Sequence, residues 1–187
     1  KSLIPSGDPR AMDALIGVLE DDDGFVRRDA CIALGRIGDP AAVEHLIAVF
    51  GRDKNRAVRY RAIDAMSVIL DRTPAEDQTG PPKWETLPDA KLAVLPAALG
   101  VFAKAMGDKA MEVRKHAVRA MAKTGDPSSI AAVVNALNDT HNWVRGEAVT
   151  TLKAYALSDY PHADGEGPLV PRLRKVLAHG SAEGRDR

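Results

Sequence analysis

Apolar residues recur along this chain at the spacing of amphipathic helices, in short segments separated by polar breaks. The first segment places Met12, Leu15, Ile16 and Leu19 on one face of a helix. The second begins after Gly24, and its apolar stripe consists of Val26, Ala30, Ala33, Leu34 and Ile37. Gly38 then ends this helix, because glycine readily adopts the left-handed conformation that terminates helices. The pattern therefore predicts helices joined in pairs by short turns.

The helix pairs repeat. The tripeptide Gly-Asp-Pro begins at residues 7, 38 and 125, and its first two copies lie 31 residues apart. A Val-Arg pair opens the second helix of each unit, at residues 26, 58, 113 and 144, and the last two of these again lie 31 residues apart. Such a period is typical of stacked helical hairpins, which bury their apolar faces only against their neighbours. The sequence thus predicts an all-α solenoid of about four helical hairpins plus a terminal helix, without β-sheet.

These units form one continuous domain with one interruption. We expect two hairpins in residues 1–70 and two more in residues 88–157. Between them, residues 71–87 are rich in proline, so we expect an inserted loop. Trp84 in this loop either folds back to pin it or is an exposed anchor for a partner. A terminal loop and helix are expected at residues 158–180, followed by a polar tail at 181–187.

Charge and composition narrow the class of protein. The 26 basic and 26 acidic side chains cancel, so no overall charge draws the chain to nucleic acid or to an anionic membrane. Cys31 is the one cysteine, and we expect a small buried thiol. No apolar stretch reaches the roughly 18 residues that span a bilayer. We expect an intracellular, cytoplasmic protein, and a cleaved organelle-targeting leader stays open because the chain begins at Lys1.

No catalytic pattern stands out. Two metal ions held between helical repeats would need His-Glu dipeptides on successive repeats, and the sequence has none. It also lacks a glycine-rich phosphate loop, Cys-x-x-Cys and Gly-x-Ser-x-Gly. The acidic run Asp21, Asp22 and Asp23 is explained by helix capping, with a calcium site as the weaker alternative. We therefore expect no enzyme activity, no metal and no cofactor.

The string DPRAMDALIGVLEDDDGFVRRDACIALGRIGDPAAVEHLI resembles the short HEAT-like repeats of phycobilisome lyase subunits and of many adaptor proteins. The resemblance extends over nearly all of residues 7–179. It implies that the arginine of each Val-Arg pair bonds a carboxylate or a carbonyl at the turn between the two helices. It also implies that the second helices line the concave side of the stack. The expected structural ladder consists of Arg27, Arg59, Arg114 and Arg145.

A binding surface follows from superimposing the four second helices. Their positions opposite the apolar stripe are mixed, with a basic part and several apolar or aromatic side chains. Each of them can also be an ordinary exposed residue. The residues expected to face a partner are Arg28, Ile32, Arg36, Tyr60, Arg61, Asp64, Lys115, His116, Arg119, Lys123, Trp143 and Thr150.

The function expected from these features is a non-catalytic interaction scaffold or adaptor. Its partner would be a protein with acidic and apolar groups, and the chain would be a fragment or subunit of a larger assembly, because its terminal helices lack covering neighbours. Two alternatives stay open: a nucleic-acid-binding HEAT-like protein, and a subunit of a phycobilin lyase-type complex, the latter on resemblance alone. Because Lys115, Arg119 and Lys123 point away from the apolar stripe, reversing their charges is expected to leave stability nearly unchanged.

Overall fold

The computed structural model describes residues 9–71, 88–124, 126 and 129–157. Within these residues the chain forms eight α-helices, one short 3-10 helix and no strand, and the predicted all-α solenoid is confirmed. The elements are α1 (Pro9–Val18), α2 (Gly24–Ile37), α3 (Ala42–Arg52), α4 (Arg56–Ile69), α5 (Asp89–Ala105), α6 (Met111–Thr124), α7 (Ser129–Asn135), η1 (Ala136–Asn138) and α8 (Asn142–Leu157). Trp84, the rest of the expected insertion after Asp71, the terminal helix and the polar tail lie outside the described residues.

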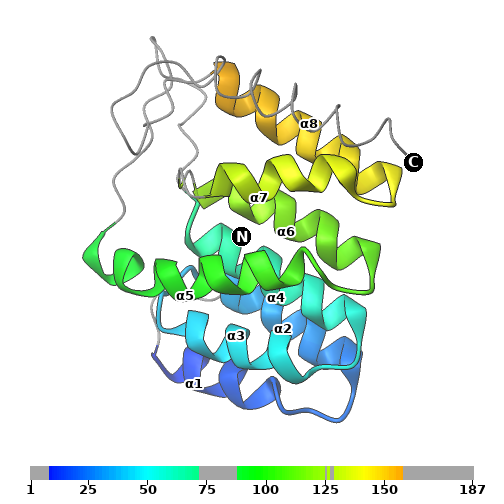
Figure 1. The fold of residues 1–187 in the computed structure, drawn as a ribbon. Coiled ribbons are helices and arrows are strands. Elements are labelled where there is room, and N and C mark those ends of the chain that lie inside the picture. Colours follow the sequence, from blue (N-terminus) through cyan, green and yellow to red (C-terminus); the bar gives the residue numbers. More distant parts are fainter. Residues whose placement is uncertain (1–8, 72–87, 125, 127–128, 158–187) are drawn as a thin grey trace, which may run out of the picture.

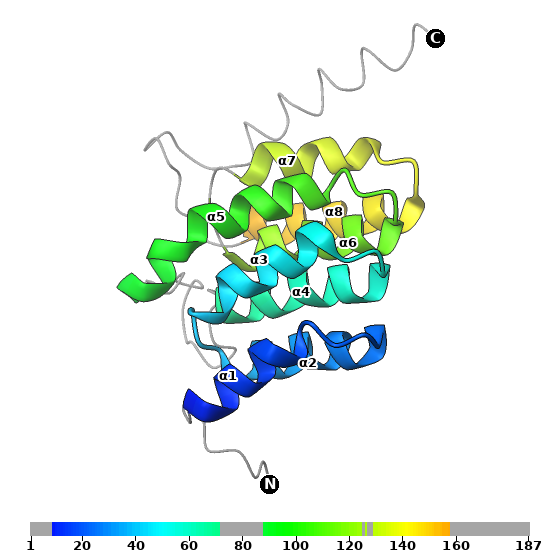
Figure 2. The same cartoon turned by 90° about the horizontal axis from the view of Figure 1, so that it is seen from below.

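The helices stack as pairs in chain order (Figure 1). The first helices of the pairs, α1, α3, α5 and α7, form one layer, and we call them the A helices. The second helices, α2, α4, α6 and α8, form the other layer, as the turned view shows (Figure 2), and we call them the B helices. Each B helix packs mainly on the next B helix, whereas contacts between successive A helices are fewer. The B layer therefore holds the stack together.

Aliphatic side chains and alanines fill the space between the layers. Leu34, Leu46, Ile63 and Met66 are fully buried, and so is Phe102 of α5. The apolar stripes read from the sequence therefore point inward, as a helical period requires. Because few aromatic residues are available, this core is built from small and medium side chains that let the helices approach closely.

Glycine permits the closest of these approaches. A Cβ atom placed on Gly35 of α2 would lie 2.8 Å from the Cα atom of Ala65 in α4, closer than real side chains come. The two helix backbones touch there because neither position carries a larger side chain. Gly38 has a different role, since it ends α2 with a φ angle of 77° that side chains other than glycine rarely adopt.

Polar side chains cap the B helices. Asp23 accepts a hydrogen bond of 2.7 Å from the backbone N–H of Phe25, and Asn55 accepts one of 2.9 Å from that of Ala57. Asp21 accepts the N–H of Asp23 at 2.8 Å. Local backbone groups thus use two carboxylates of the acidic run. No group of three metal-ligating side chains suited to a metal ion occurs in the described part of the chain.

The structure departs from the sequence pattern at two places. Val26 was expected in the core but is 38% exposed, whereas its counterparts Val58 and Val113 are fully buried. The first hairpin has a described neighbour on one side only, so fewer groups cover its outer positions. The other difference is in the fourth unit, where the expected first helix ends after Asn135 and continues as the 3-10 helix η1.

Candidate functional site

Three of the four arginines at the start of the B helices connect one hairpin to the next. Arg27 grips Asp53 through two hydrogen bonds, of 2.7 and 3.1 Å, and Arg59 grips Asp108 through two of 2.8 and 2.9 Å. Arg114 binds Asp139 in the same way, at 2.7 and 2.9 Å. In each case the carboxylate belongs to the turn of the following hairpin. Such bidentate pairs fix geometry as well as adding energy.

The same arginines also close their own turns. Arg27 Nη1 donates to the backbone carbonyls of Asp21 and Asp22, at 2.7 and 3.0 Å. Arg59 and Arg114 repeat this with the carbonyls six and five residues before them. Arg145 donates to the carbonyl of Asp139 at 2.8 Å and has no carboxylate partner among the described residues. Each of the first three arginines is therefore a clamp between two successive turns.

The clamps perturb the carboxylates that they hold. Burial alone would raise the pKa of Asp53 and of Asp108, but hydrogen bonds from Arg27 and Arg59 and the nearby positive charges outweigh it, so both pKa values lie below the ordinary one. At Asp139 the hydrogen bond from Arg114 is the largest influence, and the pKa is again lowered. These three aspartates are therefore charged at neutral pH.

Acid should weaken the stack through these groups. Because the pKa of these aspartates is lowered in the folded state, the unfolded chain takes up protons at a higher pH than the folded chain does. The stabilisation is therefore complete above the ordinary aspartate pKa of about 4. It is lost as the pH falls through the lowered pKa values of the folded state. We expect the free energy of unfolding, measured with urea between pH 3 and pH 6, to fall toward the acid end. Asp139→Asn should flatten this dependence, and an unchanged slope would show that Arg114 does not control it.

Cys31 does not provide a nucleophile. The thiol is fully buried in α2, and burial raises its pKa to about 12. A catalytic thiol instead needs access to substrate and a lowered pKa.

The outward side of the B layer, which we call the B-helix face, carries the residues expected to meet a partner. Many of them bind each other. Asp64 accepts from His116 Nδ1 at 2.5 Å with one oxygen and from Arg61 at 3.2 Å with the other. The rings of His116 and Tyr60 stack with centroids 4.8 Å apart. These contacts join α4 to α6, so much of the central part of the face is a polar network.

The basic side chains of α6 are also paired. Arg119 grips Glu147 of α8 through hydrogen bonds of 2.9 and 3.0 Å, and Lys115 lies 3.9 Å from the same carboxylate. Lys123 donates to Asp71 at 2.7 Å. The expectation that reversing Lys115, Arg119 and Lys123 leaves stability unchanged therefore does not fit the structure, because three negative charges would then face Glu147 and Asp71.

The remaining residues of the expected surface lie toward its ends. Arg28 stacks on the Phe25 ring at 5.1 Å and bonds the neighbouring Asp29. Thr150 donates to the carbonyl of Gly146 within α8. Trp143 in the first turn of α8 is 59% exposed, and its ring makes a T-shaped contact with that of His141. The structure does not bring these residues into the central network.

A groove opens on the B-helix face between α2, α4 and α6. Its volume is about 310 Å³. The residues that line it are Ile32, Gly35 and Arg36 of α2, Arg61, Asp64, Ala65, Ser67 and Val68 of α4, and Arg119 and Lys123 of α6. The close approach at Gly35 and Ala65 leaves little side chain over the contact between α2 and α4, which explains why the surface is hollow there. Cationic and apolar side chains surround this hollow.

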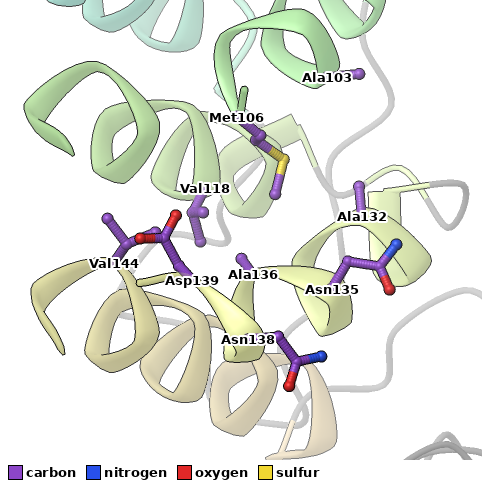
Figure 3. Close-up of a pocket in the computed structure, with 9 residues that line it drawn as sticks. All are labelled: Ala103, Met106, Val118, Ala132, Asn135, Ala136, Asn138, Asp139 and Val144. Atoms are coloured by element: carbon purple, nitrogen blue, oxygen red, sulfur yellow. The ribbon is translucent and has the colours of Figure 1, made fainter. Parts of the chain in front are cut away.

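A second cavity, of about 290 Å³, lies near the junction of the third and fourth hairpins (Figure 3). Met106 from the end of α5, Val118 of α6 and Val144 of α8 contribute apolar atoms to it. Its charged lining residue, Asp139, is already held by Arg114. The described lining residues therefore present apolar surface and the neutral amides of Asn135 and Asn138, and none of them offers a free charge to orient a ligand.

Sequence reasoning missed Asp53 and Asp108 as acidic partners, did not pair Asp139 with Arg114, and missed Glu147. A signal for the first three was present, because each lies six residues before the arginine of a Val-Arg pair. Glu147 carries no such signal, since nothing local distinguishes it from other exposed acids on a helix.

Comparisons with known structures identify proteins of similar fold. The E. coli protein YIBA has a TM-score of 0.63 at 16% identity over 95% of this chain, which spans 62% of YIBA. The complex of CpcE and CpcF of phycocyanin lyase from a Nostoc species gives 0.53 at 16%, covering 78% of this chain and 99% of that one. A designed armadillo repeat protein in complex with the peptide (KR)4 gives 0.54 at 17%, covering 94% and 74%.

None of the curated proteins compared with this chain matches it. The model of the family described as HEAT repeats matches residues 2–67 and 92–153. Those two ranges contain all four Val-Arg pairs, and they exclude the whole of the expected insertion at residues 71–87. Because they account for well over half of the sequence, this chain belongs to the HEAT repeat family.

Proposed function

We propose that this protein is a non-catalytic interaction scaffold that binds a protein partner through its B-helix face. The observation that carries this proposal is the groove between α2, α4 and α6, in which cationic side chains stand beside the exposed Val68 and the half-buried Ile32. A surface that only contacts water has no need of such an arrangement. HEAT repeats present extended surfaces of this kind because each hairpin adds one more helix to a continuous face.

The polar network beneath this surface supports the same function. Ion pairs join α4 to α6 and α6 to α8, so Asp64, Arg119 and Lys123 at the groove are held before any partner arrives. A surface that is already ordered loses less conformational entropy on binding. The designed armadillo neighbour, which is in complex with the peptide (KR)4, is an example of a similar fold that binds a peptide.

The ion pairs on the B-helix face also argue against nucleic acid as the partner. Binding to a phosphate backbone needs several cations free to neutralise phosphates. On this face Arg119 and Lys123 are already neutralised by Glu147 and Asp71. The alternative of a lyase-type subunit rests on the structural similarity to the complex of CpcE and CpcF. At 16% sequence identity, this similarity supports the fold alone.

An affinity capture with matched variants tests the proposal. The tagged protein, the double variant Arg36→Glu/Val68→Lys and the control Lys104→Glu would each be incubated with extract of the native source. Lys104 is exposed on α5, in the A layer. We expect the double variant to recover at least tenfold less of the partner than the wild type, and the control to recover as much.

Thermal melting followed by circular dichroism verifies that the variants are folded. Equal recovery by all three proteins would contradict the proposal and direct attention to the A helices.

A further inference from the structure

We infer that the groove between α2, α4 and α6 is a subsite for one carboxylate side chain of the partner, with an adjacent apolar residue packed on Ile32 and Val68. This inference rests on the proposed function and specifies its chemistry: the partner presents a short extended segment in which an aspartate or glutamate neighbours an aliphatic residue.

One of the cationic side chains around the groove has no acidic partner among the described residues. Four cationic side chains line it, from Arg36, Arg61, Arg119 and Lys123. Glu147 holds Arg119 and Asp71 holds Lys123. Asp64 is shared between Arg61 and His116, so both of its oxygens are in use. Arg36 is exposed at the end of α2 and has no ion pair with any described residue. The groove therefore lacks one negative charge.

Arg61, which lines the same groove, has unused hydrogen-bond donors. A guanidinium carries five N–H donors, yet Arg61 holds Asp64 through a single hydrogen bond of 3.2 Å. Its Nε atom is buried and meets no acceptor in the described structure. The side chain is thus held less firmly than Arg119, which binds its carboxylate through two bonds. Turning Arg61 toward an incoming carboxylate would give up the 3.2 Å bond to Asp64 and the contact of its guanidinium with the Tyr60 ring, 5.2 Å from the ring centroid. In return, the carboxylate oxygens would accept from N–H groups of Arg61 that now have no acceptor.

The apolar part of the groove is the reason for proposing an aliphatic residue next to the carboxylate of the partner. Val68 of α4 is 48% exposed, and Ile32 of α2 lines the same groove. An aliphatic side chain placed between them removes apolar surface of both partners from water. It also lowers the local dielectric around Arg36, which strengthens a charge-assisted hydrogen bond there.

The occupant carries one carboxylate rather than a run of negative charges. Asp64, Asp71 and Glu147 surround the cations of this face and would repel a polyanion. A single carboxylate between Arg36 and Arg61 supplies the missing charge, whereas further negative charges would add to the repulsion from Asp64, which lines the same groove. Charge complementarity thus favours an isolated acidic residue over a phosphate backbone.

Four synthetic peptides test the subsite. Each is an eight-residue Ser/Gly chain with a central dipeptide, which is Asp-Leu, Asn-Leu, Lys-Leu or Asp-Ser. Titration into isotopically labelled full-length protein, followed by two-dimensional NMR, measures weak affinities and locates the shifted amides. We expect Asp-Leu to bind about tenfold more tightly than Asn-Leu and more tightly than Asp-Ser, with shifts centred on Gly35, Ala65 and Val68.

Variants that change a charge of the protein distinguish recognition of the peptide carboxylate from a structural effect of the substitution. Arg36→Glu should reverse the preference, so that Lys-Leu binds better than Asp-Leu, whereas the control Lys104→Glu should keep the wild-type order. Arg61→Gln should weaken Asp-Leu and leave Asn-Leu unchanged. Asp-Leu and Asn-Leu peptides that bind alike, or an Arg36→Glu protein that keeps the wild-type order, would overturn the inference. So would tighter binding of a 20-nucleotide single strand with a steep dependence on salt.

The two proposals fail in different ways. If the peptides show no preference while Arg36→Glu/Val68→Lys still loses the captured partner, the carboxylate subsite is wrong and the scaffold function stands. If the double variant captures the partner as well as the wild type does, the B-helix face is not the binding surface.

Discussion

Leu34→Asp should unfold the first two hairpins. Leu34 is fully buried in α2, the B helix whose main contact is with α4. Replacing a buried leucine by alanine already costs about 3 to 5 kcal/mol. Aspartate removes the same methyl groups and adds a charge without a partner, which must be either neutralised or exposed. We therefore expect a loss of more than about 4 kcal/mol, a large fraction of the 5 to 15 kcal/mol typical of a whole domain.

Hydrogen exchange detected by mass spectrometry would locate this effect. In a solenoid each hairpin is stabilised by its neighbours, so protection should be lost across α1 to α4 and kept in part in α6 and α8. Ile32→Asp is the matched control, because it places the same charge on the same helix at a half-buried position beside Arg36. That variant should lose only about 1 kcal/mol. Equal melting temperatures for wild type and Leu34→Asp would show that the core assignment of α2 is wrong.

Arg59→Ala should destabilise the centre of the stack by about 3 kcal/mol or more. The side chains of Arg59 and Asp108 are only 8% and 13% exposed, so the pair is almost entirely removed from water. Removing one member of a buried pair leaves the other charge uncompensated, which typically costs 3 to 5 kcal/mol. The carbonyls of Asp53 and Lys54 would lose their donor as well.

Arg145→Ala is the natural comparison. Arg145 occupies the same position in the fourth repeat, but it is exposed and donates to a single carbonyl. Its removal should cost less than about 1 kcal/mol. Urea unfolding of the two variants at neutral pH gives both values. A similar loss of unfolding free energy in both variants would mean that the hydrogen bonds to the backbone carbonyls, and not the ion pair between hairpins, provide the stabilisation.

These two predictions bear on the proposed function. Arg59 and the network around Asp64 lie on the same helix, so the clamp that joins the second and third hairpins also positions one wall of the groove. A partner bound at the groove would contact α2, α4 and α6 together and would stabilise their stacking. The proposed binding surface and the stability of the solenoid are therefore linked through α4.

The sequence by itself determined the helices and their order of stacking. Helical period, capping residues and the recurring Val-Arg pair are local signals, and each acts within one hairpin. They were sufficient to place Leu34 and Val58 in the core and Arg36 and Lys123 on the outer face. The exception, Val26, has the same local signal as Val58 and differs in what lies beside it.

The tertiary structure alone decided which charges meet. Arg27, Arg59 and Arg114 find their carboxylates 26, 49 and 25 residues along the chain, and Lys123 finds Asp71 at a separation of 52. Pairs at such distances depend on how far one hairpin is shifted and rotated against the next, which no local pattern encodes. The same stacking neutralises Lys123 and Arg119, and it gives Arg36 no ion pair within the described part of the chain. An ion pair needs atoms within a few ångströms, and only the packed helices set that distance.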